Sequence, residues 1–221
     1  MLVMGLGSGL SAFIDALIAF LIIVLVCLPI HEFGHAWAAV TLGDNLPLYQ
    51  GRYTLNPLRH LDVFGTLLLA LVGFGWAKPV QFNPYGLRKA PNMRAGIFVV
   101  ASAGPLMNVL LAVLAAVPFR LGLVSMQGIF LSQPVAVILY TLLSINLVLA
   151  VFNLIPVPPL DGSKILAMLL PVQYDSFMAT LTQYGPFILL FMIIPLFGGQ
   201  SAVSLIVTPI WTALTKLLLG I

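Results

Sequence analysis

Charged residues are scarce in this sequence: they make up 7% of its 221 residues, while hydrophobic residues make up 61%. About a quarter of the residues in an average soluble domain are charged, so water is a poor solvent for most of this chain's surface. The composition therefore indicates a polytopic membrane protein. Nine basic and six acidic side chains are also too few for a surface that binds nucleic acid, which excludes that class of partner.

Cysteine is almost absent as well. The single one, Cys27, lies within an apolar run, so no disulfide framework can form, and we expect a small buried side chain there. The N-terminal apolar run has no basic residues before it and is longer than the core of a signal peptide, so we expect it to be retained. No stretch outside the apolar runs is long enough for its own core. Residues 1–221 are therefore expected to form a single transmembrane domain, with a core at about 25–170 and a C-terminal helix pair within 171–221.

Long apolar runs dominate what remains. A membrane-spanning helix needs about 20 apolar residues, and the runs predict an all-α polytopic membrane protein with about five or six membrane helices. The run FGTLLLALVGFGW is too short to cross, so we interpret residues 65–77 as a short re-entrant element, with a full crossing as the alternative. The expected spans lie at residues 9–42, 93–119, 135–170 with a break at PVPP, 185–197 and 203–218.

Residues 46–63 interrupt this pattern with turn-forming residues. Pro47, Gly51 and Pro57 surround the stretch YQGRYTL, which is rich in residues of high β propensity. This combination predicts a small β hairpin at the membrane interface. The rest of the fold is expected to be helical.

Positive charge is distributed unevenly and predicts the orientation. Six of the nine lysine and arginine residues fall between the first and third apolar elements, so the positive-inside rule places that whole connection in the cytoplasm. The N-terminus is then outside, and the two polar motifs described below lie in the cytoplasmic half of the membrane. We expect an integral protein of a prokaryotic plasma membrane. The six basic residues are Arg52, Arg59, Lys78, Arg88, Lys89 and Arg94.

An HExxH motif lies inside the first apolar run. His31 and His35 are four residues apart, so on a helix their side chains point from the same face, as two ligands of one metal ion must. Glu32, the only glutamate in the chain, is placed to take a proton from a metal-bound water. Ionisable groups inside a membrane helix are costly unless they are paired or bind metal. This cost favours a metal site over a helix end that is solvated at the interface.

A catalytic zinc site usually has three protein ligands and one open position. Two residues are candidates for the third ligand: Asp161 in NLIPVPPLDG and His60 in NPLRHLD. The prolines before Asp161 interrupt an apolar helix, and non-helical backbone at membrane depth is tolerated only inside the protein or along a water-filled cavity. That context favours Asp161. Its alternative role, as N-cap of a helix that starts at Gly162 and Ser163, has equal weight on spacing alone.

Three separated motifs agree in order and spacing. They are HEFGH at residues 31–35, AGPLMN at 103–108 and FNLIPVPPLDG at 152–162. Together they resemble the site-2 protease family of intramembrane metalloproteases, over about residues 25–170. We expect no PDZ-like insertion and no C-terminal regulatory domain, so the chain resembles the minimal members of that family.

The resemblance implies roles for five residues. His31, His35 and Asp161 match the family's zinc ligands, so Zn²⁺ is the expected cofactor. Glu32 matches its catalytic glutamate. Asn153 matches an asparagine that steadies the scissile carbonyl or its oxyanion.

Other polar residues have less defined roles. Asn146 lies seven residues before Asn153, on nearly the same helical face, and either lines the same cavity or makes an interhelical hydrogen bond. His60 and Asp62 are expected to be a solvated pair in the interfacial turn rather than a second metal site. Gly104 is expected to allow close helix packing.

The chain is therefore expected to be an intramembrane zinc endopeptidase that hydrolyses peptide bonds within or near transmembrane segments of membrane-protein substrates. Its expected partners are these substrates and the lipid bilayer, while a homo-oligomer or a regulatory partner stays open. An extended substrate could add to the strand expected near YQGRYTL. The alternatives are a membrane metal transporter, since intramembrane His and Asp residues also mark ion pathways, and an inactive relative that binds substrates.

Overall fold

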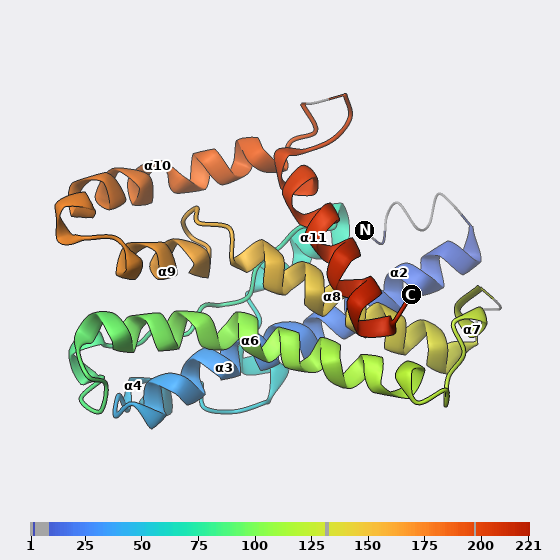
Figure 1. Ribbon diagram of the computed structural model, residues 1–221, viewed down its shortest axis with the longest axis horizontal. Coiled ribbons are helices and arrows are strands. Elements are labelled where there is room, and N and C mark those ends of the chain that lie inside the picture. Colours follow the sequence, from blue (N-terminus) through green and yellow to red (C-terminus); the bar gives the residue numbers. More distant parts are fainter. Residues whose placement is uncertain (1, 3–8, 131–132, 197) are drawn as a thin grey trace.

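The structure is a computed structural model that describes residues 2, 9–130, 133–196 and 198–221. Figure 1 shows that its long helices α3, α6 and α8 lie lengthwise in the molecule. The helices, in chain order, are α2 (Leu10–Ile22), the π-helix η1 (Ile23–Cys27), α3 (Leu28–Thr41), α4 (Leu46–Tyr49), η2 (Pro57–Arg59), α5 (Val63–Val72), η3 (Pro84–Gly86), α6 (Met93–Arg120), α7 (Gln127–Phe130), α8 (Pro134–Asn153), α9 (Asp161–Leu169), η4 (Val172–Tyr174), α10 (Asp175–Ile193) and α11 (Ala202–Leu219).

Five helical segments among the described residues are long and apolar enough to cross a membrane, and α5 is a shorter apolar helix. No strand occurs in the described part of the chain. The predicted all-α class with five or six membrane helices is therefore confirmed, and the chain is an integral membrane protein. The five segments are Leu10–Thr41, Met93–Arg120, Pro134–Asn153, Val172–Ile193 and Ala202–Leu219.

The predicted interfacial β hairpin is wrong. The stretch that suggested it consists of α4, tight turns and η2, and the β-bridge found among the described residues joins Leu61 to Ala77 instead. Its backbone bonds are local: the Arg52 amide donates to the Pro47 carbonyl, and the Thr54 amide donates to the Arg52 carbonyl, at 2.8 and 2.9 Å. Turn formation thus overrides the β propensity of these residues.

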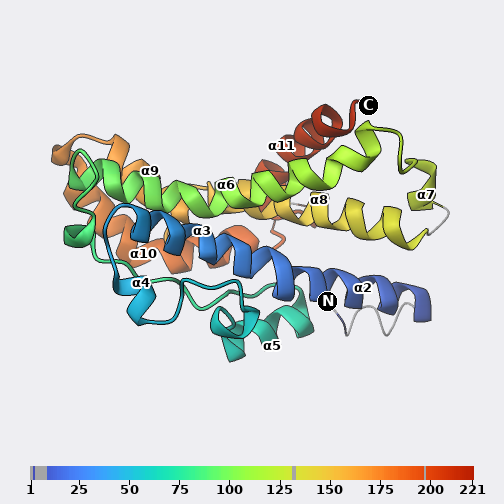
Figure 2. The same ribbon diagram turned by 90° about the horizontal axis from the view of Figure 1, so that it is seen from below.

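α5 and its flanks form a loop that returns to its starting point. The helix has ten residues, and the chain after it folds back along it. A Cβ on Gly75 would lie 2.7 Å from the Leu69 Cβ, so only glycine fits this close return. The bridge between Leu61 and Ala77 closes the loop at its base. The chain therefore enters and leaves this loop at one place, while its re-entrant position in the membrane stays a prediction. Figure 2 shows α5 on the same side of the molecule as α2 and α3.

The first span is one continuous helix with a π-turn inside it. The Leu28 amide donates to the Ile23 carbonyl, five residues back, and Pro29 follows directly. Proline has no amide to continue the α-helical ladder, so the irregular turn lies where the ladder is weakest. The HExxH motif begins immediately after this irregularity.

α6 is the central helix of the molecule. It packs against α3, α8, α9 and α11, and both views show it running lengthwise between neighbours (Figures 1 and 2). Small residues allow the close approach: three alanines of α6 share a buried cluster with leucines of α8. A Cβ on Gly34 of α3 would lie 2.8 Å from the carbonyl oxygen of Ala103 in α6. The HExxH turn of α3 is therefore held directly against α6.

The predicted helix break near PVPP is confirmed. α8 ends at Asn153 and α9 begins at Asp161, and residues 154–160 connect them without a helix. A Cβ on Gly162 would lie 2.6 Å from the carbonyl oxygen of Ile155, so only glycine allows this tight connection. The break therefore sets the start of α9 against the end of α8.

α10 begins earlier than predicted, at Asp175 rather than at residue 185. The polar residues in this extra stretch fit a helix because Thr180 and Thr182 donate their hydroxyls to carbonyls one turn earlier, at 3.1 and 2.8 Å. The predicted end of this span, Phe197, lies outside the described residues.

Candidate metal centre

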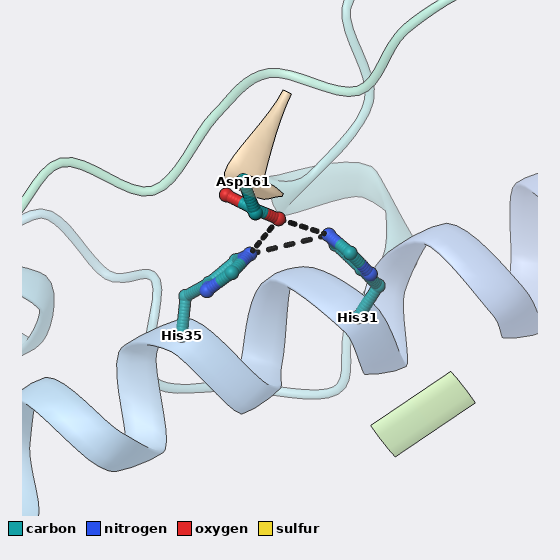
Figure 3. A group of neighbouring side chains, drawn as sticks. All are labelled: His31, His35 and Asp161. Atoms are coloured by element: carbon teal, nitrogen blue, oxygen red, sulfur yellow. Dashed lines mark hydrogen bonds and ion pairs between the residues drawn. The ribbon is translucent and has the colours of Figure 1, made fainter. Parts of the chain in front are cut away.

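α3 carries both histidines of the HExxH motif on one face. His31 and His35 are buried, with 5% and 7% of their surface exposed. Their rings pack edge to face with centroids 4.8 Å apart, and their Nε2 atoms lie 3.1 Å from each other. One helical turn separates them, as the spacing predicts, so both rings point to one place beside α3 (Figure 3).

The Nδ1 atom of each histidine is held by α6. His35 Nδ1 lies 2.7 Å from the backbone carbonyl of Val100, and a carbonyl can only accept, so this nitrogen carries the proton. His31 Nδ1 lies 2.6 Å from Asn108 Oδ1 and donates to it. The Nε2 atom of each neutral ring then keeps its lone pair. These bonds therefore select the tautomer that a metal ligand needs.

Asp161 approaches the two histidines from the first turn of α9. Its Oδ2 lies 3.2 Å from His31 Nε2 and 3.0 Å from His35 Nε2, and its Oδ1 accepts from the Lys164 ammonium at 2.9 Å. The N-cap position of α9 belongs to Leu160, and no side chain among the described residues caps it. The alternative N-cap role for Asp161 is therefore wrong, and its carboxylate is free to face the histidines.

The three converging atoms need a cation between them. Two imidazole nitrogens and a carboxylate oxygen, all bearing lone pairs, lie within 4.8 Å of one another and repel unless a proton or metal ion separates them. Zn²⁺ binds such atoms at about 2.0–2.2 Å in a tetrahedron, which puts neighbouring ligand atoms about 3.3–3.6 Å apart. The observed separations of 3.0–3.2 Å fit that ion after a small expansion.

Gly104 of α6 leaves room beside the two histidines. A Cβ at this position would lie 2.7 Å from His31 Nε2 and would contact His35 Nε2 even more closely. Any larger residue would occupy the space into which both nitrogens point. The sequence predicted a packing role for Gly104. The structure adds a second role: because Gly104 has no side chain, the space beside the two histidine nitrogens stays open for a metal ion.

Glu32 follows His31 directly and is 8% exposed. Its Oε2 accepts a hydrogen bond from the Val80 amide at 2.8 Å, so the segment that follows α5 reaches the carboxylate. Arg52 is also buried. Burial lowers the pKa of its guanidinium, and the Glu32 carboxylate opposes this shift. The carboxylate is thus fixed by a backbone amide and has a buried cation within electrostatic range.

Asn153 is the last residue of α8, and its side chain is partly buried. Its Nδ2 donates to the Leu149 carbonyl, one turn earlier, at 2.9 Å. The structure therefore brings the three expected metal ligands together, while the expected catalytic roles of Glu32 and Asn153 stay predictions.

His60, the other candidate for the third ligand, lies outside this group. It is fully buried, its Nε2 bonds the Thr54 carbonyl at 2.7 Å, and its Nδ1 has no hydrogen-bond partner among the described residues. Asp62 accepts from the Gly65 amide at 2.8 Å and caps α5. The predicted solvated pair is therefore wrong: one residue is buried and the other is a helix cap.

Asn108 and Lys164 were missed by the sequence reasoning. Asn108 ends the AGPLMN motif, but its fully buried contact with His31 becomes visible only in the structure. An amide in the middle of an apolar membrane helix is a usable signal, because an unpaired amide there is costly. Lys164 lies one turn after Asp161 on α9, where a cation can neutralise the carboxylate.

An HExxH helix and a carboxylate from a second helix, set among membrane-spanning helices, define a metallopeptidase-type centre in a membrane protein. The model of Peptidase family M50 matches residues 121–195, a range that contains Asn153 and Asp161. "Putative zinc metalloprotease YwhC" of Bacillus subtilis is 38% identical over 189 residues, which are 83% of this chain and 84% of that protein. The chain therefore belongs to the peptidase M50, or site-2 protease, family.

More distant relatives carry similar names. "Putative zinc metalloprotease Rip2" of Mycobacterium tuberculosis is 30% identical over 186 residues, which are 79% of this chain and 66% of that protein. "Zinc metalloprotease MJ0392" of Methanocaldococcus jannaschii is 26% identical over 159 residues, 72% of this chain and 36% of that protein. No solved structure matches the chain significantly. Family membership and the donor set confirm the predicted cofactor, Zn²⁺, and the predicted class, a membrane zinc metalloprotease.

Proposed function

We propose that the chain is an intramembrane endopeptidase that hydrolyses peptide bonds within or near transmembrane segments of membrane-protein substrates. The observation that carries this proposal is the location of the donor set: both histidines and Glu32 belong to the apolar span Leu10–Thr41. A peptide bond reaches a site on such a helix most directly from a segment that is itself in or beside the bilayer.

Metal binding and proton transfer are assigned to different residues of the chain. His31, His35 and Asp161 would hold Zn²⁺, which when bound polarises the peptide carbonyl and activates water as the nucleophile. Glu32 takes the proton from the attacking water and delivers it to the leaving amine. The Val80 amide holds Glu32 through Oε2, which leaves Oε1 for proton transfer. The base is thus fixed beside a prearranged set of ligand atoms.

Asn153 is proposed to donate a hydrogen bond to the oxygen of the scissile carbonyl. Its Nδ2 carries two hydrogens, and one of them is donated to the Leu149 carbonyl. The second hydrogen is left for the substrate carbonyl, so Asn153 can bind both acceptors at once.

A helical substrate has to unwind before cleavage, because its peptide bonds are hydrogen-bonded and shielded within the helix. The strand expected to receive it near YQGRYTL is absent from the described residues, so no strand edge is offered to the substrate there. The non-helical segment 78–83 reaches Glu32 through Val80 instead, and it borders the place where the scissile bond must lie.

The active site is proposed to lie in the cytoplasmic half of a prokaryotic plasma membrane, with the N-terminus outside. The support is the positive charge of the connection between α3 and α6, which holds Arg52, Arg59, Lys78, Arg88 and Lys89. The two helices that flank this connection, α3 and α6, carry the histidines and the residues that hold them.

A metal transporter is less well supported. Ion pathways through membranes usually pass several acidic or histidine sites, whereas a single His–His–Asp group among the described residues could hold a metal ion. In addition, Glu32 follows His31 in the order that peptidases use.

One experiment distinguishes the proposed peptidase from the alternative, an inactive relative that only binds substrates. Purified, zinc-loaded chain is incubated with a panel of single-span membrane proteins and one soluble protein, with and without a chelator, and Glu32→Gln is run beside it. We expect cleavage of at least one membrane protein, loss of cleavage with chelator and recovery with zinc, and no cleavage by the variant. Zinc-loaded protein that cleaves nothing in the panel, or a variant as fast as the wild type, would overturn the proposal.

A further inference from the structure

A chain of buried hydrogen bonds runs from the metal site into the protein interior. Asn108 of α6 and Asn146 of α8 are both fully buried. Asn108 Oδ1 lies 2.6 Å from His31 Nδ1, and Asn108 Nδ2 donates to Asn146 Oδ1 at 2.7 Å. Asn146 Nδ2 donates to the Leu142 carbonyl at 2.8 Å and to Cys27 Sγ at 3.2 Å. A continuous path of hydrogen bonds thus joins His31 to Cys27 through two side-chain amides.

The bonds of Asn146 fix the direction in which its amide points. The Leu142 carbonyl can only accept, so the NH₂ group of Asn146 must face it, and Oδ1 must face Asn108. Asn108 then has to present its own NH₂ group to Asn146, and this group also reaches the Cys27 carbonyl at 3.4 Å. The oxygen of Asn108 is left for His31. Each amide therefore has one favourable orientation.

The opposite orientation of Asn108 would be unfavourable in two ways. It would set the oxygens of Asn108 and Asn146 against each other across the present 2.7 Å contact, in an interior without water to pair them. It would also turn an NH₂ group toward His31 Nδ1, which stabilises the tautomer with its proton on Nε2. That tautomer has no lone pair on Nε2 to offer a metal ion.

We propose that Asn146 is a positioning residue for the metal site: it orients Asn108, and Asn108 keeps the proton of His31 on Nδ1, so that Nε2 is ready to bind Zn²⁺. Asn146 acts through Asn108 rather than on the metal ligand itself. The inference rests on His31 being a zinc ligand of the proposed peptidase. Its first readout is the tautomer of a histidine, which can be measured without proteolysis.

The π-turn η1 supplies the far end of this path. It lies one turn before His31 in the same helix, and both the carbonyl and the sulfur of Cys27 accept bonds from the asparagines. π-turns within α-helices occur often at functional sites. The first span, α6 and α8 are therefore tied together at one polar node, and His31 is held both by its own helix and by Asn108.

Histidine tautomers can be read by ¹⁵N NMR, and the chain has three histidines to assign. In zinc-free wild-type protein we expect His31 to be protonated at Nδ1. In Asn146→Leu we expect a mixture of tautomers or a ring protonated at Nε2, because Asn108 is released to rotate. The matched control is Ser144→Ala, on the same helix, whose hydroxyl has no hydrogen-bond partner among the described residues and whose loss should leave His31 unchanged.

Zinc affinity, measured by competition with a fluorescent zinc indicator, is the second readout. Loss of an outer partner of a metal-binding histidine weakens metal affinity about 10–100-fold. We expect such a loss in both Asn146→Leu and Asn108→Leu, and no further loss in the double variant, because Asn146 acts through Asn108. Combining Asn108→Asp with Asn146→Leu should restore much of the affinity, since a carboxylate offers an oxygen to His31 in either orientation.

Three results would each overturn the inference: an unchanged His31 tautomer in Asn146→Leu, additive losses of zinc affinity in the double variant, or no recovery with Asn108→Asp. Asn146→Ala provides the same comparison if the leucine variant does not fold. If the tautomer and zinc results are as expected but the wild type cleaves no substrate, the proposed function fails and this inference stands.

Discussion

Polar side chains are used differently in two regions of this membrane protein. Around the metal site, in α3, α6 and α8, they bond across helices, as His31 does to Asn108 and Asn108 does to Asn146. In the C-terminal pair, α10 and α11, the threonine hydroxyls bond carbonyls of their own helix, as the Thr212 hydroxyl does to the Thr208 carbonyl at 2.8 Å. Bonds from this pair to α6 lie at exposed helix ends: Asp175 pairs with Arg94, and the Leu217 carbonyl accepts from Arg120. The buried bonds between helices are therefore concentrated around the metal site.

More residues are buried around the metal site than in the C-terminal pair. Of the described residues, eleven in α6 are buried, against three in α10 and three in α11. Interhelical hydrogen bonds and close packing hold the metal site rigidly, whereas α10 and α11 are held mainly by apolar contacts. The difference teaches that this chain places its costly intramembrane polar bonds where the chemistry needs a fixed geometry.

The largest effect is expected at Glu32, in the rigid region. Glu32→Gln should lower the cleavage rate about 10²–10⁴-fold, because a general base contributes that much to the chemical step. The glutamine keeps an oxygen for the Val80 amide, so zinc content and thermal stability should match the wild type. Cleavage rates and zinc content are measured on the same samples. Loss of zinc together with activity would show that Glu32 supports the site rather than the reaction.

Adding one methyl group to α6 should affect zinc binding at the metal site but not elsewhere on the helix. Gly104→Ala sets a Cβ beside both ligand nitrogens and should weaken zinc binding roughly 5–150-fold, which corresponds to about 1–3 kcal/mol of overpacking. In the control Gly96→Ala, on the same helix, the new Cβ crowds Leu87 and Ala90 at 2.9–3.1 Å rather than the histidines, so zinc affinity should stay unchanged. Equal affinities of the two variants in a zinc titration would remove Gly104 from the metal site.

The α8–α9 break should tolerate substitution less well than α10, which packs on it. Gly162→Ala presses a Cβ against backbone carbonyls of the same connection and should lower the free energy of unfolding by about 1–3 kcal/mol. Gly185→Ala places its Cβ 2.6 Å from both the Cβ and the carbonyl oxygen of Pro158, but α10 has few buried residues and can shift, so the cost should lie at the lower end of that range, about 1 kcal/mol. Thermal unfolding in one detergent ranks the two variants. A reversed ranking would mean that α10 is rigidly docked.

The smallest effect is expected in the C-terminal pair. Thr212→Val removes a hydroxyl that bonds only its own helix among the described residues, and stability should change by no more than about 0.5 kcal/mol. Asn108→Leu provides the contrast, because it breaks bonds between helices. If Thr212→Val lowers the melting temperature as much as Gly162→Ala does, intrahelical bonds also hold this fold together and the two regions are not different.

The metal ligands could be predicted from the sequence because local rules place them. The four-residue spacing of His31 and His35 sets both on one helical face. The prolines before Asp161 break a membrane helix, and such non-helical backbone is tolerated only inside the protein or along a water-filled cavity. These rules need no knowledge of the other helices. The positions of the two candidate histidine ligands therefore follow from a short stretch of sequence. For Asp161 the stretch only favoured it over His60, and the family resemblance supplied the ligand role.

Asn108 and the supposed hairpin could not be predicted in this way. Whether the amide of Asn108 faces lipid, a neighbouring helix or His31 depends on how α6 is rotated against α3, which long-range packing at Gly34 and Gly104 decides. The hairpin prediction was wrong for the opposite reason, because local rather than long-range interactions decide the structure of that stretch. Its residues favour strands, but local turns around Pro47 use the backbone groups that a strand would need.

Zinc content of the purified chain tests the central claim most directly, because the chain has buried histidines of two kinds. His35 belongs to the His–His–Asp group, whereas His60 bonds the Thr54 carbonyl outside it. We predict one zinc ion per chain in the wild type and in His60→Gln, and loss of zinc in His35→Gln, measured by elemental analysis after gel filtration. Full zinc content in His35→Gln, or loss of zinc in His60→Gln, would contradict this assignment of the metal site.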